Sequence, residues 1–151
     1  MIDIVTVNWN SGAQLRECVD SVLTHEKREV NAVVVVDNGS TDGSAQLVDG
    51  LPGVTVIRTG RNLGFAAACN LGAAESDSPY ILFLNPDTRV EEDSLSIPLG
   101  FMERPENANV GIGGIQLVDE EGQISLTCAR FPTLRRLMVS ALGLDKLPGM
   151  R

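Results

Sequence analysis

The residues best placed to carry chemistry are Asn85 and Asp87, which directly follow the apolar run 81–84. Such a run predicts a buried strand, so the Asn-x-Asp puts two oxygen-bearing side chains at the carboxyl edge of a sheet. Open α/β sheets bind ligands at that edge. Oxygen ligands suit a hard divalent cation, and Mg²⁺ is usually held by one or two carboxylates together with substrate phosphates. The spacing therefore indicates phosphate chemistry, although Asn-Pro-Asp is also a good turn sequence.

A second polar loop follows the first predicted strand and contains Asn8, Trp9, Asn10 and Ser11. In a doubly wound sheet this loop faces the ligand crevice, so Trp9 could cover a base or a sugar face. A core or interface position is an equal alternative for a lone tryptophan. The missing Gly-x-Gly-x-x-Gly argues against a dinucleotide site, and the missing Gly-x-x-x-x-Gly-Lys-Ser/Thr argues against a P-loop.

Asp37 and Asn38 end the second predicted strand. An acid or amide there can hydrogen-bond a ribose hydroxyl or the imide edge of a pyrimidine. The alternative is a helix cap and turn, a role that Ser40, Thr41 and Asp42 can fill by themselves. We therefore favour ligand binding for the Asp37 and Asn38 pair.

The third crossover is framed by Asn62, Gly64 and Asn70. Gly64 and the small residues after it allow a helix to pack closely and leave room for a ligand. Asn70 lies on that helix and could reach the loop that holds Asn85 and Asp87. Tight packing alone would explain the same glycine and alanines.

The elements that must position these residues alternate between strands and helices. Strands are predicted by β-branched and apolar runs, and helices by apolar spacing of three and four residues. The order strand-helix-strand predicts an α/β fold with a mostly parallel sheet and helices on both faces. The strands are expected at 2–7, 32–36, 54–58 and 80–84, with helices at 14–24, 44–48, 64–74 and 94–102. Farther on we expect a strand at 110–118, a turn at 119–122, a strand at 123–126 and an amphipathic segment at 130–144.

Composition narrows the class of protein. A chain of 151 residues is one domain by size. A net charge of −8 argues against a nucleic-acid partner, which needs a basic face, but it permits a nucleotide. Three widely spaced cysteines without a Cys-x-x-Cys pair favour small buried hydrophobes in a reducing cytoplasm. No signal segment or stretch of ~20 apolar residues occurs, so we expect no membrane span.

Four blocks of this sequence, in order, resemble the amino-terminal part of a family 2 type glycosyltransferase, most like the rhamnosyltransferase-like members. They are VTVNWNS at 5–11, VVVDNGSTDGS at 34–44, NLGFA at 62–66 with Asn70, and LNPDT at 84–88. The resemblance covers residues 1–118 and implies the GT-A fold, a Rossmann-like sheet.

The resemblance also implies an activity. Such enzymes transfer a sugar, usually with inversion, from a nucleoside-diphosphate sugar, here to a saccharide or lipid-linked acceptor of a cell wall or surface polysaccharide. The expected donor is a deoxythymidine- or uridine-diphosphate sugar, with dTDP-rhamnose as the first expectation. The expected nucleotide-sugar-binding residues are Asn8, Trp9, Asn10, Asp37, Asn38, Asn62, Gly64, Asn70 and Asn85. Asp87 would be the principal contact of Mg²⁺ or Mn²⁺, because Asn85 replaces the first carboxylate of the family's Asp-x-Asp.

The acceptor side of such an enzyme has no counterpart here. The carboxylate that acts as general base has no candidate, because Glu120 and Glu121 fall in the predicted turn and His25 reads as a surface residue. We interpret 1–118 as the donor-binding core, and 119–151 as a hairpin, amphipathic segment and tail that lead to a missing acceptor-binding half. A non-catalytic nucleotide-sugar-binding module is the alternative. A nucleotidyltransferase is a weaker one, because that class needs a glycine-rich basic loop after the first strand.

The predicted amphipathic segment at 130–144 indicates where the protein works and what it contacts. Arg130, Arg135 and Arg136 flank apolar residues, so the segment could rest on an anionic membrane or pack on the missing half. We expect a cytoplasmic protein that works at the inner face of the plasma membrane. The exposed apolar residues of this segment also make self-association plausible.

Overall fold

The computed structural model describes residues 1–25, 28–119 and 121–125. The chain divides into two compact units, one spanning 1–113 and the other beginning at Gly114. The predicted boundary at residue 118 stays a prediction. The amphipathic segment, the tail and Cys128 lie outside the described residues, as does Glu120.

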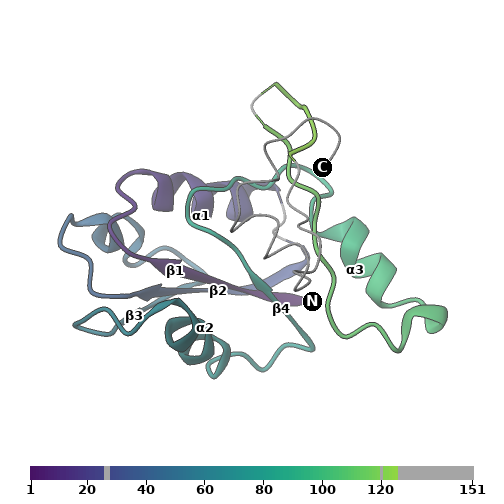
Figure 1. Cartoon of the computed structure of the whole chain (residues 1–151), viewed down its shortest axis with the longest axis horizontal. Helices are drawn as coiled ribbons and strands as arrows, with labels where there is room; N and C mark the ends of the chain where they lie inside the picture. Colours follow the sequence, from purple (N-terminus) through teal and green to yellow (C-terminus); the bar gives the residue numbers. More distant parts are fainter. Residues whose placement is uncertain (26–27, 120, 126–151) are drawn as a thin grey trace, which may run out of the picture. The chain divides into compact units, whose positions relative to one another are not determined.

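The first unit is built on a four-stranded parallel sheet whose strand order is β3-β2-β1-β4 (Figure 1). The strands are β1 (Ile2–Asn8), β2 (Val30–Asp37), β3 (Val54–Arg58) and β4 (Tyr80–Phe83). The intervening helices are α1 (Gln14–His25), the 3-10 helix η1 (Ser44–Val48) and α2 (Phe65–Ala73). The helix α3 (Ser96–Met102) and the 3-10 turn η2 (Pro105–Asn107) follow β4. The predicted order of elements is confirmed through α3, with ends shifted by one or two residues.

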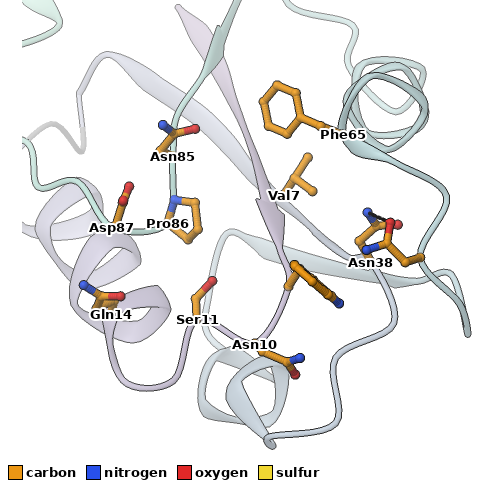
Figure 2. Close-up of a pocket in the computed structure, with 11 residues that line it drawn as sticks. Val7, Asn10, Ser11, Gln14, Asn38, Phe65, Asn85, Pro86 and Asp87 are labelled. Atoms are coloured by element: carbon orange, nitrogen blue, oxygen red, sulfur yellow. Dashed lines mark hydrogen bonds between the residues drawn. The ribbon is translucent and has the colours of Figure 1, made fainter.

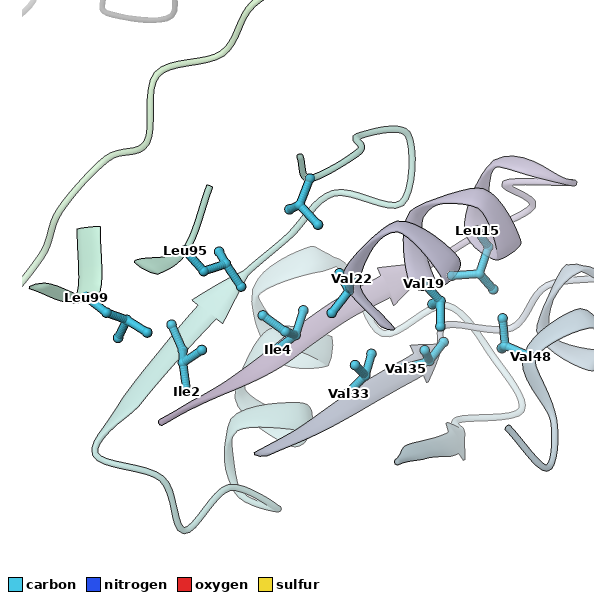
Figure 3. Close-up of a cluster of buried hydrophobic side chains, with 11 residues drawn as sticks. Ile2, Ile4, Leu15, Val19, Val22, Val33, Val35, Val48, Leu95 and Leu99 are labelled. Atoms are coloured by element: carbon cyan, nitrogen blue, oxygen red, sulfur yellow. The ribbon is translucent and has the colours of Figure 1, made fainter. Parts of the chain in front are cut away.

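Helices cover both faces of the sheet, as the sequence predicts. The α1 face packs Ile4 and Val35 against Val19 and Val22 (Figure 3). The α2 face packs Val5 and Val36 of the sheet against Ala68 and Cys69 of α2. Because β1 and β2 are buried on both sides, their continuous apolar runs are what a central parallel strand requires.

Helix α2 lies so close to the sheet that only glycine fits at one position. A Cβ atom on Gly72 would come within 2.5 Å of Val5 Cγ1 and 3.0 Å of Val36 Cγ2. The run of small residues that the sequence shows in this helix therefore serves close packing on β1 and β2.

Asp3 is the one acidic residue in β1. It is buried, and its carboxylate oxygens accept hydrogen bonds. Asn31 donates to its Oδ1 at 2.9 Å and Ser76 to its Oδ2 at 2.6 Å. Burial alone would raise the pKa of Asp3, but these hydrogen bonds, together with those from Ser78, hold it below the ordinary value. Asp3 thus joins β2 and the loop before β4 to the start of β1.

The predicted strand at 110–118 is wrong. Only one antiparallel bridge, Val118 to Ile124, forms there, and it spans the predicted turn. Gly111, Gly113 and Gly114 weaken a strand because they have no side chain to pack. Ile112 is 93% exposed, so its side chain gains little burial that could compensate. The strand at 123–126 is likewise reduced to this bridge, within its described part.

No helix among the described residues is long and apolar enough to cross a membrane.

Candidate functional site

A pocket of about 410 Å³ opens at the carboxyl ends of the strands (Figure 2). The chain runs from β1 outward to β2 and β3, then returns to β4 on the other side of β1. Open α/β sheets bind ligands where the strand order reverses in this way. Loops from all four strands reach the pocket, and its lining residues are Val7, Trp9, Asn10, Ser11, Gln14, Asn38, Asn62, Phe65, Asn85, Pro86 and Asp87.

Two sides of this pocket differ in chemistry. Figure 2 shows Asn85 and Asp87 on one side and Asn38 on the other, with Val7 of β1 between them. Among the described lining residues, Asp87 is the only charged one, and five carry a side-chain amide. Trp9 and Phe65 add two aromatic side chains that are 59% and 60% exposed. The lining can therefore accept and donate many neutral hydrogen bonds, but within the described part of the chain it offers an anion no cationic side chain.

The turn that carries Asp87 is organised around the backbone carbonyl of Asn85. This oxygen accepts hydrogen bonds from Thr88 N at 3.2 Å, from Thr88 Oγ1 at 2.6 Å and from the Cys18 thiol at 3.5 Å. Helix α1 supports the turn further, because Ser21 Oγ accepts from Val90 N at 3.1 Å. The position of Asp87 is thus fixed by hydrogen bonds on either side of it.

The Cys18 thiol is suited to this donor role. Burial raises its pKa to about 11, and the nearby charge of Asp87 acts in the same direction. The thiol therefore keeps its proton at neutral pH. An ion pair between Glu17 and Arg89, both on the surface, adds a further link between α1 and the segment after the turn.

Asn8 and Asp37, two predicted ligand-binding residues, are buried beneath the pocket and do not line it. Asn8 Nδ2 lies 2.8 Å from Ser44 Oγ, 3.0 Å from Ser40 Oγ and 3.2 Å from Asp37 Oδ1. Ser40 N also donates to Asp37 Oδ1 at 3.2 Å. These contacts join the loop after β1 to the loop after β2, which fixes the two loops that border the pocket.

Asn10 lies where the loops after β1 and β2 meet at the surface, and hydrogen bonds hold it in place. Its side-chain oxygen accepts from Thr41 N at 2.8 Å, and its own N–H donates to Ser40 Oγ at 3.0 Å. Asp42 accepts from Gly12 N at 2.9 Å, and hydrogen bonds from Ser44 lower the pKa of Asp42 below its ordinary value. The residues that the sequence suggested as caps are thus the ones that brace the Trp9 loop.

Asn38 and Asn62 meet at the second side of the pocket. Asn38 Nδ2 donates to Asn62 Oδ1 at 3.1 Å, and Asn38 Oδ1 accepts from Leu63 N at 2.8 Å. Gly64 N also donates to Asn62 Oδ1 at 2.8 Å. Nearby, Gly39 has φ +82°, and a Cβ there would lie 2.7 Å from the backbone of Arg61, so the two loops touch directly.

The structure brings together most of the predicted site residues, but not all. Trp9, Asn10, Asn38, Asn62, Asn85 and Asp87 line the pocket. Gly64 caps α2 just beside it, and Asn70 is exposed on α2 outside the lining. Sequence reasoning missed Val7, Gln14, Phe65 and Pro86, which also line the pocket. Each adjoins a residue or loop that the sequence singled out, and Gln14 begins the helix after the Trp9 loop.

The lining provides too few ligands to hold a hard divalent cation by itself. It fits such a cation only if another molecule supplies further ligands. Asp87 offers a carboxylate and Asn85 an amide, and the described residues contain no group of three or more His, Cys, Asp or Glu side chains that could hold a metal. Mg²⁺ is characteristically bound in this way, through one or two carboxylates plus phosphate oxygens and water. The donor set therefore fits a cation that arrives with a phosphate.

Comparison with known proteins places these features in a family. The family model described as "Glycosyl transferase family 2" matches residues 3–141. The chain is 29% identical over 148 residues to N-acetylglucosaminyl-diphospho-decaprenol L-rhamnosyltransferase of Mycobacterium tuberculosis, covering 90% of this chain and 47% of that protein. It is also 29% identical over 124 residues to the glycosyltransferase GlyG of Streptococcus pneumoniae, covering 80% and 40% of the two chains. The chain spans less than half the length of these relatives.

Solved structures show the same fold. Mannosyltransferase PcManGT from Pyrobaculum calidifontis, solved in complex with GDP-Man and Mn²⁺, matches with a TM-score of 0.63 and 20% identity. The match covers 69% of this chain and 32% of that one. The S. aureus TarS 1-349 crystal structure matches with a TM-score of 0.61 and 23% identity, over 68% and 32% of the two chains. The GT-A type fold expected from the sequence is confirmed.

Proposed function

Because the chain belongs to glycosyl transferase family 2, we propose that its pocket binds a nucleoside-diphosphate sugar and that the protein transfers this sugar to a saccharide or lipid-linked acceptor. The observation that carries the proposal is the pocket's division into two sides. Asn38 and Asn62 present amides suited to a base, and Asp87 lies across the pocket where a diphosphate would reach it.

The charge of the lining supports a role for a metal. A diphosphate beside Asp87 would meet a like charge, and no cationic side chain among the described residues lines the pocket to offset it. Asp87 and Asn85 would hold Mg²⁺ or Mn²⁺ together with the diphosphate oxygens. The bound cation would supply positive charge that stabilises the diphosphate leaving group. The structurally similar mannosyltransferase was solved with Mn²⁺ and GDP-Man, which supports this assignment.

The protein's own residues would orient the donor. Trp9, exposed at the pocket and held by a braced loop, offers a flat apolar surface to a base or sugar. The turn anchored on Asn85 O and Cys18 would hold the Asp87 carboxylate in place before the donor arrives. Preorganisation of this kind reduces the conformational entropy that the protein must lose when it binds a ligand.

Rhamnose is the donor sugar that we propose, and inversion the stereochemical course. Support for rhamnose comes from the name of the Mycobacterium tuberculosis relative, an L-rhamnosyltransferase acting on a decaprenol-linked sugar. The decaprenol in that name also supports a lipid-linked acceptor for this protein, and an activity located at a membrane surface. Inversion needs a base that deprotonates the acceptor hydroxyl as it attacks the anomeric carbon. Asp87 is the only carboxylate among the described lining residues, and it is assigned to the metal, so residues 1–118 are proposed as the donor-binding core.

The test is calorimetric titration of the protein with UDP and dTDP, with and without Mn²⁺. We expect binding that requires the metal, and we expect Asp87→Asn to weaken the metal-dependent binding at least tenfold, ~1.4 kcal/mol. Asp77→Asn is the matched control, because it removes the same charge from an exposed residue before β4, at the other end of that strand. Equal affinity with and without Mn²⁺, in wild type and both variants, would contradict the metal assignment.

Catalysis is tested separately. Incubation with dTDP-rhamnose and lipid-linked N-acetylglucosamine acceptors should yield a glycosylated product if these 151 residues contain the whole site. Tight donor binding without any product would favour the donor-binding module instead. Absence of binding to every nucleoside diphosphate and nucleotide sugar would overturn the proposed function.

A further inference from the structure

We propose that the Ser40 hydroxyl positions Trp9 for the bound nucleotide, by holding the residues on both sides of that tryptophan. The inference rests on the proposed function, because it concerns how the same pocket receives a nucleoside diphosphate. Ser40 belongs to the loop after β2 and is not among the residues that line the pocket. It is therefore a positioning residue, which acts on the ligand only through Trp9.

The Ser40 side chain joins its own loop to the loop that carries Trp9. Its Oγ accepts a hydrogen bond from Asn10 N at 3.0 Å and another from Asn8 Nδ2 at 3.0 Å. Asn8 and Asn10 come immediately before and after Trp9 in the sequence. A hydroxyl oxygen has two lone pairs, so it can accept both bonds at once. One side chain outside the pocket thus contacts both neighbours of Trp9.

The Trp9 loop depends on contacts of this kind for its shape. Asn10 has φ +55°, and Gly12, two residues later, has φ +57°. The left-handed region is uncommon for residues other than glycine, although asparagine adopts it more often than most. Such a conformation persists where the surrounding structure fixes it. Trp9 is itself 59% exposed, so little packing holds its ring, and its direction follows from how its neighbours are held.

The two neighbours of Trp9 would respond differently to loss of the Ser40 hydroxyl. Asn8 is fully buried, and its NH₂ group has two other acceptors within 3.2 Å, so it would stay in place. The Asn10 N–H bonds no other described residue, and only the contact from Thr41 N to the Asn10 side chain would remain. Ser40→Ala should therefore free the Asn10 side of the loop and leave the sheet intact.

The fluorescence of Trp9 measures the first part of the proposal without any nucleotide. Trp9 is the only tryptophan of the chain, so its signal reports on this loop alone. Ser40→Ala should lower the fluorescence anisotropy, because a ring on a looser loop moves more on the nanosecond timescale. Ser96→Ala is the matched control, since it removes a hydroxyl that donates to Asp93 at 2.8 Å at the start of α3, outside the pocket lining. It should leave the anisotropy as in wild type.

A double-mutant cycle with Trp9→Ala measures the second part, with UDP and Mn²⁺ as the probe. We expect Ser40→Ala to weaken UDP binding roughly three- to tenfold when Trp9 is present, the value of about one hydrogen bond. In the Trp9→Ala background the same change should weaken it by less than about twofold, because the side chain that Ser40 positions is gone. A general loss of structure would weaken UDP in both backgrounds. Thermal melting checks that each variant is folded.

Unchanged anisotropy in folded Ser40→Ala would overturn the proposal, and so would unchanged affinity for UDP. A loss of affinity that is equal with and without Trp9 would also overturn it, because Ser40 would then act by another route. In each of these cases wild-type protein still binds UDP, so the proposed function stands. If wild-type protein binds no nucleoside diphosphate, the proposed function fails and this proposal fails with it.

Discussion

The thiol of Cys18 donates to the carbonyl oxygen of Asn85 at 3.5 Å, so helix α1 supports the turn that carries Asp87 from below. Cys18 is fully buried, and its sulfur bonds a backbone group whose position decides where the Asp87 carboxylate lies. A cysteine that composition alone marks as a small buried hydrophobe therefore also holds part of the candidate site.

The buried thiol should make stability depend on alkaline pH. Because the folded pKa of Cys18 is raised to about 11 from 9.0, the folded state holds this proton more tightly than the unfolded chain. The resulting stabilisation is complete below pH 9 and is lost as pH rises toward 11. It amounts to roughly 2 to 3 kcal/mol at most.

Urea unfolding of wild type and Cys18→Ala at pH 8, 9, 10 and 11 measures this effect. Other groups titrate in the same range, but they are common to both proteins, so the difference isolates Cys18. Cys18→Ala should be less stable at pH 8 and should lose less stability by pH 11. Parallel stability curves over this range would show that the thiol does not titrate as expected.

Trp9 should contribute to nucleotide binding without contributing to the core. Its side chain is exposed and lines the pocket, and stacking of a base on an aromatic side chain is worth roughly 1–3 kcal/mol by alanine substitution. Trp9→Ala should therefore weaken UDP binding about five- to a hundredfold with little change in melting temperature. Phe101→Ala on α3 is the control, because Phe101 is an exposed aromatic residue outside the pocket lining. Unchanged UDP affinity in Trp9→Ala would remove Trp9 from the site.

Two helical glycines should respond to alanine in opposite directions. Gly72→Ala places a methyl group 2.5 Å from Val5 Cγ1, and overpacking of this kind typically costs 1–3 kcal/mol. Gly100→Ala in α3 meets nothing within 4 Å, so it should stabilise the fold by about 0.4–1 kcal/mol. Urea unfolding gives both values.

The cause of the Gly72 effect can be checked with a double variant. Val5→Ala removes the methyl group that the new Cβ would strike, so Gly72→Ala should cost less in that background than in wild type. Additive losses in the double variant would mean that the clash is relieved in another way.

The sheet could be predicted from the sequence because its strands are buried on both faces. Val33, Val34, Val35 and Val36 form an unbroken apolar run, and such a run has few alternatives to a central parallel strand. The run at 110–118 also contains several apolar residues, but its three glycines and the exposure of Ile112 prevent a strand. Burial, which the sequence does not show directly, separates the two cases.

The candidate site could be located from the sequence. The sequence could not show which of its residues line the pocket and which are buried beneath it. Asn8 and Asn38 are both amides at the carboxyl end of a strand, yet Asn8 is enclosed by Ser40 and Ser44 while Asn38 lines the pocket. The difference depends on partners that lie some thirty residues away in the sequence. Sequence position identifies the edge of the sheet, whereas only the tertiary contacts decide which side chains line the pocket.

The strand order also constrains how the chain can fold. β1 is the first strand in sequence, yet it lies inside the sheet between β2 and β4, and its partner β4 comes long after it along the chain. During synthesis, β1 must therefore remain without its second neighbour until β4 and the three helices before it have emerged. Pairing between such distant segments slows folding and leaves an apolar strand open to wrong partners in the meantime. Early packing of α1 and β2 onto β1 would limit that exposure. A substitution that delays the formation of this first β-α-β unit should therefore lower the yield of folded protein. Its effect on the stability of the protein that has folded should be smaller.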